Sequence, residues 1–305
     1  MHTFPSILEG ISDLNLEQIH HLLKKAKAFK NGTLKPKKDK NSAYTVASYF
    51  EENSTRTKLS FIQACENLNA RFLNFDVSSS SVKKGESLEE TFFTLKSLGV
   101  NICVYRGSRS GALTSFKKRP PLKIINGGDG MHQHPTQALL DLFTMIENNH
   151  NPKNKTLTII GDCIHSRVCH SLVNLITLWG GKVILTGPKG CLPENYKRKG
   201  VTLTHNLDEA LKKSDVIYLL RVQLERHRRF GESEYFSDYA QRFGMNIQKL
   251  QSLNREIPIY HAGPTNIGME ISNDIIQSKY YMGHKEVENS IFIRMAILEE
   301  LMNYE

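Results

Sequence analysis

The sequence predicts an α/β protein of two doubly wound domains, each a parallel sheet flanked by helices. Short β-branched or apolar runs alternate with longer amphipathic stretches, the pattern of parallel strands joined by helical crossovers. This alternation occurs twice, once in each half of the chain. The length of 305 residues also exceeds the roughly 250–300 residues at which a single core usually stops growing.

Eight runs have the composition of buried strands. In the first half they are Ala43–Phe50, Arg71–Asp76, Val100–Tyr105 and Leu122–Asn126. In the second half they are Thr156–Gly161, Lys182–Gly187, Asp215–Leu220 and Pro258–Ala262.

Helical spacing of apolar residues fills the stretches between these runs. Ser87 and Glu90 predict a capping box at the start of one helix, because each side chain can satisfy a backbone N–H of the first turn. Pro135 is typical of a first helical position, and the helix that it begins, followed by the polar stretch 148–155, is a candidate connection between the domains. A last amphipathic segment covers residues 287–303.

Composition is that of an ordinary globular protein, with 39% hydrophobic and 23% charged residues. No apolar run approaches the roughly 20 residues that cross a bilayer, and the N-terminus has no secretion leader, so we expect a cytoplasmic protein without a membrane partner. The five cysteines form no CxxC pair, which argues against a disulfide framework and against a zinc site.

The net charge of +9 raises the question of nucleic acid, but the basic clusters are confined to residues 35–40 and 226–229. Neither cluster carries a nucleic-acid-binding motif. We interpret them as solvated loop charge and expect no nucleic-acid partner. A positive field also attracts small anions.

Ser54, Thr55, Arg56 and Thr57 lie between a predicted strand and its helix. Free N–H groups at a helix start, together with hydroxyl groups and a guanidinium, suit a phosphate dianion. A plain helix cap is the alternative, because serine and threonine are common caps without any ligand.

Two further polar segments follow strands of the first half. The segment 78–86 is longer than most strand-to-helix loops, which indicates either a functional loop or a flexible linker. Arg106 follows the third strand, and His134, Thr136 and Gln137 stand at the helix start near Pro135. Such positions on one edge of a parallel sheet form the crevice where ligands bind, although a histidine at a helix start is often only a cap.

In the second half, Arg167 and the pair Arg221 and Gln223 follow two predicted strands. Two arginines at neighbouring strand ends can each bind a carboxylate bidentately, which indicates a dicarboxylate ligand. Ordinary surface arginine is the alternative. Residues 261–264 form a turn in which Gly263 and Pro264 could present carbonyl groups to a ligand.

The order and spacing of these segments resemble the aspartate and ornithine carbamoyltransferase family. The stretches that carry the resemblance are FEENSTRTKLSF, KKGESLEET, HPTQALLDLF, GDCIHSRVCHSL, LLRVQLER, HAGPTNIGMEI and IRMAILEEL. They extend from about residue 45 to the end of the chain.

The resemblance implies a carbamoyl-phosphate-binding domain of residues 1–134 plus 287–305, with the last helix packed on it, and an aspartate-binding domain of residues 135–286. It implies donor-binding roles for Ser54, Thr55, Arg56, Thr57, Ser80, Lys84, Arg106, His134, Gln137, Gly263 and Pro264. Among these, Arg56, Thr57, Lys84, Arg106 and His134 are the expected catalytic residues. Ser80 and Lys84 match residues that reach a neighbouring subunit, so the resemblance implies a homotrimer with shared active sites. It leaves open whether regulatory or other pathway subunits join.

For the acceptor, the resemblance favours L-aspartate over ornithine. Ornithine enzymes carry a cysteine in the turn that is Ala262–Gly263 here, whereas Lys84, Arg167, Arg221, Gln223 and Gly263 match aspartate ligands. A cationic ornithine side chain would meet uncompensated arginines. The implied reaction is direct attack of the aspartate amine on carbamoyl phosphate, an early step of pyrimidine biosynthesis that needs no cofactor and no metal.

Four positions depart from the family pattern. Glu51 replaces a usual phenylalanine, Lys58 an arginine, Gly107 a histidine, and Ile267 an arginine. Two competing hypotheses remain at this point: a carbamoyltransferase with a different acceptor, and a non-catalytic scaffold whose basic surface binds nucleic acid.

Overall fold

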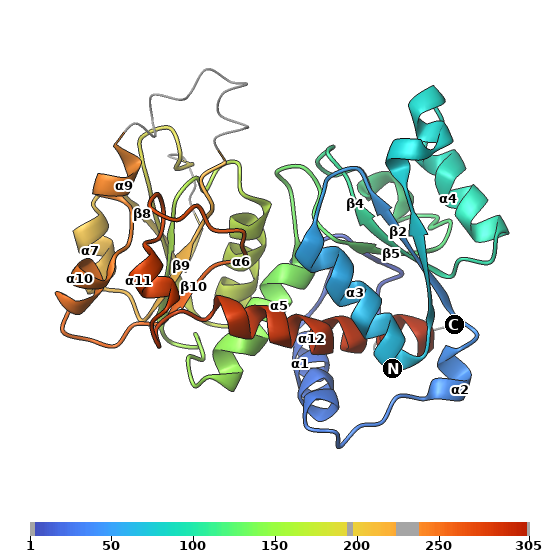
Figure 1. The fold of residues 1–305 in the computed structure, drawn as a ribbon, viewed down its shortest axis with the longest axis horizontal. Coiled ribbons are helices and arrows are strands. Elements are labelled where there is room, and N and C mark those ends of the chain that lie inside the picture. The colour runs from blue at the N-terminus through green and yellow to red at the C-terminus, as the bar shows by residue number, and fades with distance from the viewer. Residues whose placement is uncertain (1–3, 194–197, 224–237, 304–305) are drawn as a thin grey trace. The chain divides into compact units, whose positions relative to one another are not determined.

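The computed structural model describes residues 4–193, 198–223 and 238–303, in two compact units (Figure 1). The first unit comprises Met1–Leu140 and Val287–Glu305, and the second comprises Asp141–Glu286. The chain passes to the second unit within α5 (Pro135–Glu147) and returns within α12 (Gly283–Asn303). The basic cluster at 226–229 lies outside the described residues.

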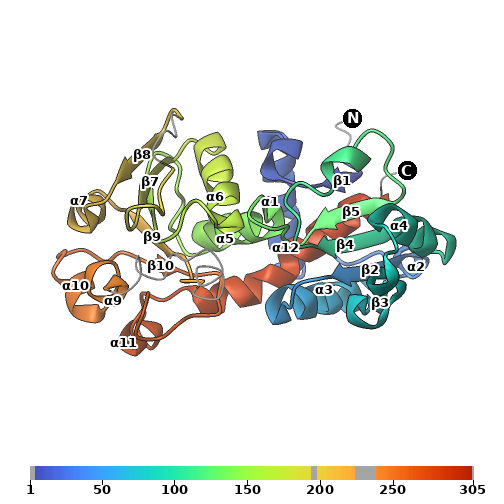
Figure 2. The ribbon, with the colours of Figure 1, turned by 90° about the horizontal axis from the view of Figure 1, so that it is seen from above.

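A five-stranded parallel sheet forms the centre of the first unit, in the order β1-β5-β4-β2-β3 (Figure 2). The strands are β1 (Ile7–Leu8), β2 (Thr45–Phe50), β3 (Arg71–Phe75), β4 (Ile102–Arg106) and β5 (Lys123–Asn126). The helices wholly within this unit are α1 (Leu16–Lys30), α2 (Lys38–Asn41), α3 (Thr55–Leu68) and α4 (Leu88–Ser97). Four 3-10 helices join them: η1 (Ile11–Asp13), η2 (Val77–Ser79), η3 (Ser81–Lys84) and η4 (Thr114–Phe116).

Alternating side chains give the first sheet two apolar faces. On one face, the rings of Tyr49 and Tyr105 stack with their centroids 5.5 Å apart, and Phe92 of α4 meets both edge-on. On the other face, Val104 and Thr57 of α3 approach the same glycine, Gly127. Helices therefore cover both faces, as a doubly wound sheet requires.

The C-terminal part of α12 packs on the first unit, which confirms the position expected for the last helix. The guanidinium of Arg294, although buried, lies 5.0 Å from the ring centre of Phe61 on α3. Lys25 of α1 forms an ion pair with Glu299 at 3.2 Å. Cation–π contacts and paired charges of this kind make burial of polar groups tolerable.

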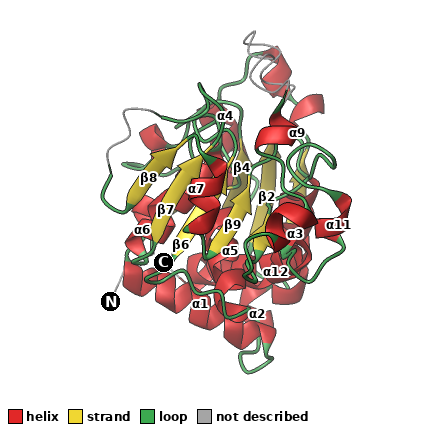
Figure 3. Ribbon diagram, turned by 90° about the vertical axis from the view of Figure 1, so that its left-hand side faces the viewer, coloured by secondary structure: helices red, strands yellow, loops and turns green. Residues whose placement is uncertain are grey.

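The second unit repeats the architecture, with the parallel strand order β10-β9-β6-β7-β8; Figure 3 shows β8, β7, β6 and β9 side by side. Its strands are β6 (Thr156–Ile160), β7 (Lys182–Thr186), β8 (Val201–Thr204), β9 (Val216–Leu219) and β10 (Ile259–Tyr260). Its helices are α6 (Arg167–Leu178), α7 (Leu207–Lys212), α9 (Tyr239–Arg242), α10 (Ile247–Gln251) and α11 (Asn273–Ile276).

All eight predicted strands are confirmed, with ends shifted by a few residues, as are the Ser87–Glu90 capping box and the helix start at Pro135. The sequence missed β1 and β8. Both are short edge strands, and two residues of β1 are too few to establish a period.

The strand order reverses once in each sheet, between β2 and β4 in the first unit and between β6 and β9 in the second. Ligands of open α/β sheets bind outside the carboxyl ends of the strands at such a switch point. The fold therefore presents one candidate ligand position per unit.

The five cysteines are free and buried. A search of the described helices finds none with the length and apolar character needed to cross a bilayer.

Candidate active site

The start of α3 lies at the switch point of the first unit. Ser54 is in extended conformation and its Oγ accepts a hydrogen bond from the N–H of Thr57 at 3.3 Å, so the cap predicted here is confirmed. This bond satisfies one of the four N–H groups that a helix start leaves without a partner inside the helix. Thr55 and Arg56 are exposed, whereas Thr57 is 4% exposed. The helix start thus combines an N-terminal dipole with two accessible side chains.

Arg106, the last residue of β4, joins this cluster. Its Nη1 donates to the carbonyl of Gly127 at 2.9 Å, and its Nη2 lies 3.6 Å from a carboxylate oxygen of Glu52. A methyl group placed on Gly127 would lie 3.5 Å from Cγ2 of Thr57. The ends of β2, β4 and β5 therefore bring Arg106, Thr57 and Glu52 together around the Gly127 backbone.

A buried polar network shapes the loop that leads to His134. The Nδ2 of Asn126 donates to Asp129 Oδ1 at 2.6 Å, and the same oxygen accepts from the N–H of Gln133 at 3.0 Å. His134 itself is 4% exposed, and its Nδ1 lies 3.4 Å from Oγ1 of Thr136. Asn126 and Asp129 were not predicted from the sequence as site residues. Their signal was the glycine- and aspartate-containing loop between a strand and a helix.

The segment that carries Ser80 and Lys84 is folded into η2 and η3. Ser80 caps η3, because its Oγ accepts a hydrogen bond from the N–H of Val82 at 3.4 Å, and the same Oγ donates to the carbonyl of Val77 at 2.9 Å. Val82 and Lys83, together with Ser54 and other residues, line a cleft of about 390 Å³. Lys84 is exposed at the end of η3 and does not line this cleft. The segment 78–86 is therefore a structured loop with an accessible lysine, and not a flexible linker.

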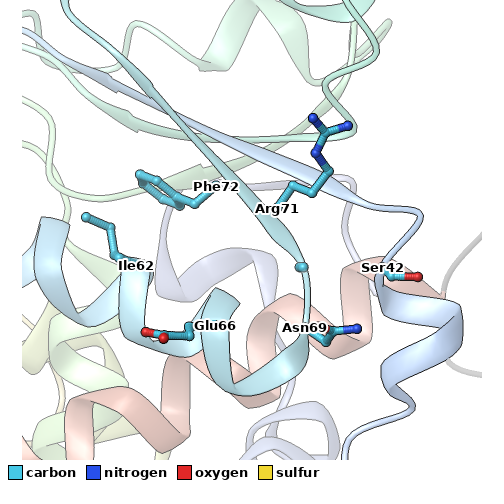
Figure 4. Close-up of a pocket in the computed structure, with 7 residues that line it drawn as sticks. Ser42, Ile62, Glu66, Asn69, Arg71 and Phe72 are labelled. Carbon is cyan, nitrogen blue, oxygen red and sulfur yellow. The ribbon is translucent and has the colours of Figure 1, made fainter.

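A second groove, of about 430 Å³, lies between α3 and the edge strand β3 (Figure 4). It is lined by Ser42, Ile62, Glu66, Asn69, Ala70, Arg71 and Phe72. None of the residues predicted for the active site lines it.

In the second unit, the predicted arginines lie at the switch point between β6 and β9. Arg167 begins α6 behind the Ser166 cap and is 9% exposed. Asp162 follows β6, and its Oδ2 lies 2.9 Å from Nδ1 of His165. Arg221 and Gln223 follow β9 and are half-buried.

A buried carboxylate that was not predicted from the sequence, Glu270, joins two loops of the second unit. It accepts a hydrogen bond from the N–H of Val222 at 3.4 Å, and it lies 3.3 Å from Nε2 of His261. Asn266 donates to the carbonyl of Val222 at 2.8 Å. The backbone between Arg221 and Gln223 is thereby tied to the turn that contains Gly263, whose φ of 64° favours glycine.

Among the described residues, one group has the geometry to hold a metal ion: Glu9, Asp129 and His132. Each carboxylate already has donors, because Glu9 accepts from Lys117 at 2.8 Å and Asp129 from the N–H of Gly111 at 2.7 Å. Burial would lower the pKa of Lys117, but its bonds to Asp13 and Glu9 outweigh burial and raise that pKa. These residues serve as a buried polar network that holds the loop near Asn126.

The fold and the two switch points define a class: a two-unit, doubly wound α/β protein with arginine side chains near the switch point of each sheet. Comparison with known proteins specifies the family. Residues 8–147 match the carbamoyl-P binding domain of the aspartate/ornithine carbamoyltransferases, and residues 153–301 match their Asp/Orn binding domain. The chain therefore belongs to the aspartate/ornithine carbamoyltransferase family.

Similar proteins include the aspartate carbamoyltransferase catalytic subunits of Christiangramia forsetii and Flavobacterium psychrophilum. Each is 40% identical over 95% of this chain, covering 94% and 95% of the respective relative. Among solved structures, aspartate transcarbamoylase from Trypanosoma cruzi in complex with carbamoyl phosphate is 27% identical, with a TM-score of 0.84 over 97% of this chain and 96% of that one. The catalytic subunit of M. jannaschii aspartate transcarbamoylase is 30% identical, with a TM-score of 0.83 over 98% of both chains.

Proposed function

We propose that this chain is an aspartate carbamoyltransferase, which transfers the carbamoyl group of carbamoyl phosphate to L-aspartate in an early step of pyrimidine biosynthesis. The observation that carries the proposal is that each unit has basic groups at its own switch point, with Thr57 and Arg106 around Gly127 in the first unit and Arg167 and Arg221 in the second. The names of the relatives support the same acceptor.

In the proposed reaction, the neutral amine of aspartate attacks the carbonyl carbon of carbamoyl phosphate. A C–N bond forms, and the carbonyl oxygen becomes an oxyanion that faces Arg106, His134 and Thr57. The C–O bond to phosphate then breaks, phosphate leaves with the bonding electron pair, and the amine proton passes to it. The helix start at Ser54–Thr57 stabilises the phosphate throughout.

On the acceptor side, Arg167 and Arg221 bind the two carboxylates of aspartate. Gln223 and Gly263 contact the remaining polar atoms of aspartate. The carbonyl groups of Gly263 and Pro264 also contact the donor, and Gln137 contacts the carbamoyl nitrogen. Holding two anionic substrates together supplies much of the rate, since well-oriented pairs reach effective concentrations on the order of 10⁵ M or more.

The test of this function is a colorimetric assay for carbamoyl aspartate with the purified protein, repeated with ornithine and other amines in place of aspartate. Product from aspartate alone supports the assignment. Product from another amine and none from aspartate would show that the acceptor is that amine. Steeply salt-dependent nucleic-acid binding without any carbamoyl product would favour the scaffold hypothesis.

We further propose that the active site is completed by Ser80 and Lys84 of a neighbouring copy in a homotrimer. The supporting observations are the exposure of Lys84, the open edge of β3 with Leu73 42% exposed, and the groove beside it. An exposed edge strand with apolar side chains is a surface that proteins usually cover.

Mixing two inactive proteins tests the shared site. When Arg56→Ala and Lys84→Ala chains are dissociated and reassociated together, some sites combine intact halves from both, and activity returns. Each variant reassociated alone is the control. A solution mass of one chain, or mixtures as inactive as either variant, would contradict sharing.

A further inference from the structure

Glu51, one of the departures from the family pattern, contacts the chain on both sides of Arg106. Its N–H donates to the carbonyl of Arg106 at 2.9 Å, which continues the pairing of β2 with β4. Its Oε2 accepts two hydrogen bonds from Ser108, one from the N–H and one from Oγ, both at 2.8 Å. One residue therefore holds the backbone at Arg106 and again two positions later.

Gly107, a second departure, lies inside this turn. A methyl group on Gly107 would lie 1.8 Å from Oη of Tyr105, so the tyrosine ring occupies the space that a side chain would need. Tyr105 stacks on Tyr49, whose hydroxyl donates to Oε1 of Glu51 at 3.2 Å. The two departures therefore belong to one arrangement. Gly107 leaves space for the ring of Tyr105, and Tyr49, which stacks on that ring, donates a hydrogen bond to Glu51.

The turn determines where the Arg106 side chain begins. Beyond the sheet, this turn also accepts a backbone hydrogen bond from the N–H of Gly130 to the carbonyl of Gly107, at 2.9 Å. A guanidinium binds a phosphate or an oxyanion well only when its own position is fixed beforehand. Loss of the Glu51–Ser108 bonds would leave Arg106 attached to a less restrained backbone.

We infer that Glu51 is a positioning residue: through Ser108 and the glycine turn it holds Arg106 where it meets the phosphorylated donor. This inference rests on the proposed function for the identity of the donor. Electrostatics alone predicts the opposite effect, because a carboxylate near an anion site repels the anion and its removal would tighten binding. The sign of the change in affinity therefore separates positioning from charge.

The experiment compares Glu51→Ala, Glu51→Gln and Ser108→Ala with wild type. Calorimetry gives the Kd for inorganic phosphate and for carbamoyl phosphate, and steady-state kinetics give kcat and KM for each substrate. Glu209→Gln, on the exposed surface of α7, is the control for loss of one negative charge.

We expect Glu51→Ala to weaken carbamoyl phosphate binding about fivefold, the effect of about one net hydrogen bond, with the KM for aspartate unchanged. Glu51→Gln should lose less, because its amide oxygen still accepts from Ser108, and Ser108→Ala should lose least because its N–H remains. Tighter or unchanged donor binding in Glu51→Ala would overturn the inference. Equal losses for both substrates together with a lower melting temperature would show a structural role only and would also overturn it.

If Glu51→Ala does not fold, Glu51→Gln and Ser108→Ala decide the question. Weaker donor binding in these variants supports the inference, and tighter or unchanged donor binding overturns it. A wild-type protein that binds phosphate in a Glu51-dependent way but forms no carbamoyl aspartate would overturn the proposed function and leave the positioning role intact.

Discussion

In the proposed function, the two switch points bind anions by different means. In the first unit, the backbone N–H groups and hydroxyls at the start of α3 act together with Arg106, whose guanidinium is fixed by Gly127. In the second unit, Arg167 begins α6, and Arg221 follows β9 next to Val222, whose N–H donates to the buried Glu270. A backbone site recognises the shape of a phosphate, whereas two separated side chains recognise the spacing of two carboxylates. Substitutions at the first switch point should therefore lower kcat, whereas substitutions at the second should weaken the binding of aspartate.

The largest effect is expected from Arg56→Ala. Arg56 is exposed in the first turn of α3, so its removal should leave the melting temperature unchanged. Loss of a preorganised donor to developing charge lowers kcat by about 10²–10³. Gln63→Ala, an exposed change on the same helix, is the matched control. Near-normal turnover of Arg56→Ala in the carbamoyl aspartate assay would contradict the donor assignment.

The next effect should fall on the acceptor alone. Arg221→Ala removes one charge-assisted contact to a carboxylate, worth about 1.5–3 kcal/mol, so the KM for aspartate should rise roughly 10- to 150-fold. The Kd for inorganic phosphate should stay at the wild-type value. If phosphate affinity falls together with that for aspartate, the separation of the two binding modes is wrong.

Local chemistry made much of the fold predictable. The Ser54 cap and the Ser87–Glu90 capping box depend on residues only three positions apart in the sequence. A strand such as Thr156–Ile160 is recognisable from its own run of apolar residues. Strands β1 and β8 were missed because edge strands this short show little pattern. Longer strands already gave the fold class without them.

The residues proposed to bind the two substrates were recognised from short motifs, but the groups that contact their backbone were not. Glu270 contacts Val222 from 48 positions along the chain, and Ser108 meets Glu51 from 57 positions. No local pattern encodes such a meeting, because both partners are ordinary polar residues until the strands align them. The same holds for Tyr105, whose ring explains Gly107 only when the turn is folded.

Two glycines test how tightly each sheet edge is packed. In Gly107→Ala the new methyl group meets the Tyr105 side chain, and in Gly187→Ala it would lie 2.2 Å from the carbonyl oxygen of Gly161. Overpacking typically costs about 1–3 kcal/mol, and backbone yields less readily than a side chain. We expect both to lower the free energy of unfolding by denaturant, Gly187→Ala more. The reverse order would show that the stacked tyrosines of the first unit cannot move.

The smallest expected effect is a pH dependence of folding stability that arises in the second unit. His150 in the second unit is half-buried, with Nδ1 2.8 Å from Oη of Tyr260. Burial, aided by the positive charge of Lys155, lowers its pKa below the ordinary value of 6.5. The unfolded chain therefore takes up the proton first as pH falls. The stabilisation is present above pH 6.5 and is lost as pH falls through the lower folded pKa.

Because the ring is partly solvated, the loss should stay below about 1 kcal/mol. It is measured by denaturant unfolding at pH 8, 6 and 5, for wild type and for His150→Gln, whose amide can still bond Tyr260 but does not titrate. In the first unit, burial would raise the pKa of Glu300, but Lys25 and His21 outweigh it and lower that pKa, so its contribution is lost only below about pH 4.5. Wild type should thus lose stability relative to the variant between pH 6.5 and 5. Parallel curves for the two proteins over that interval would exclude His150 as the group that titrates.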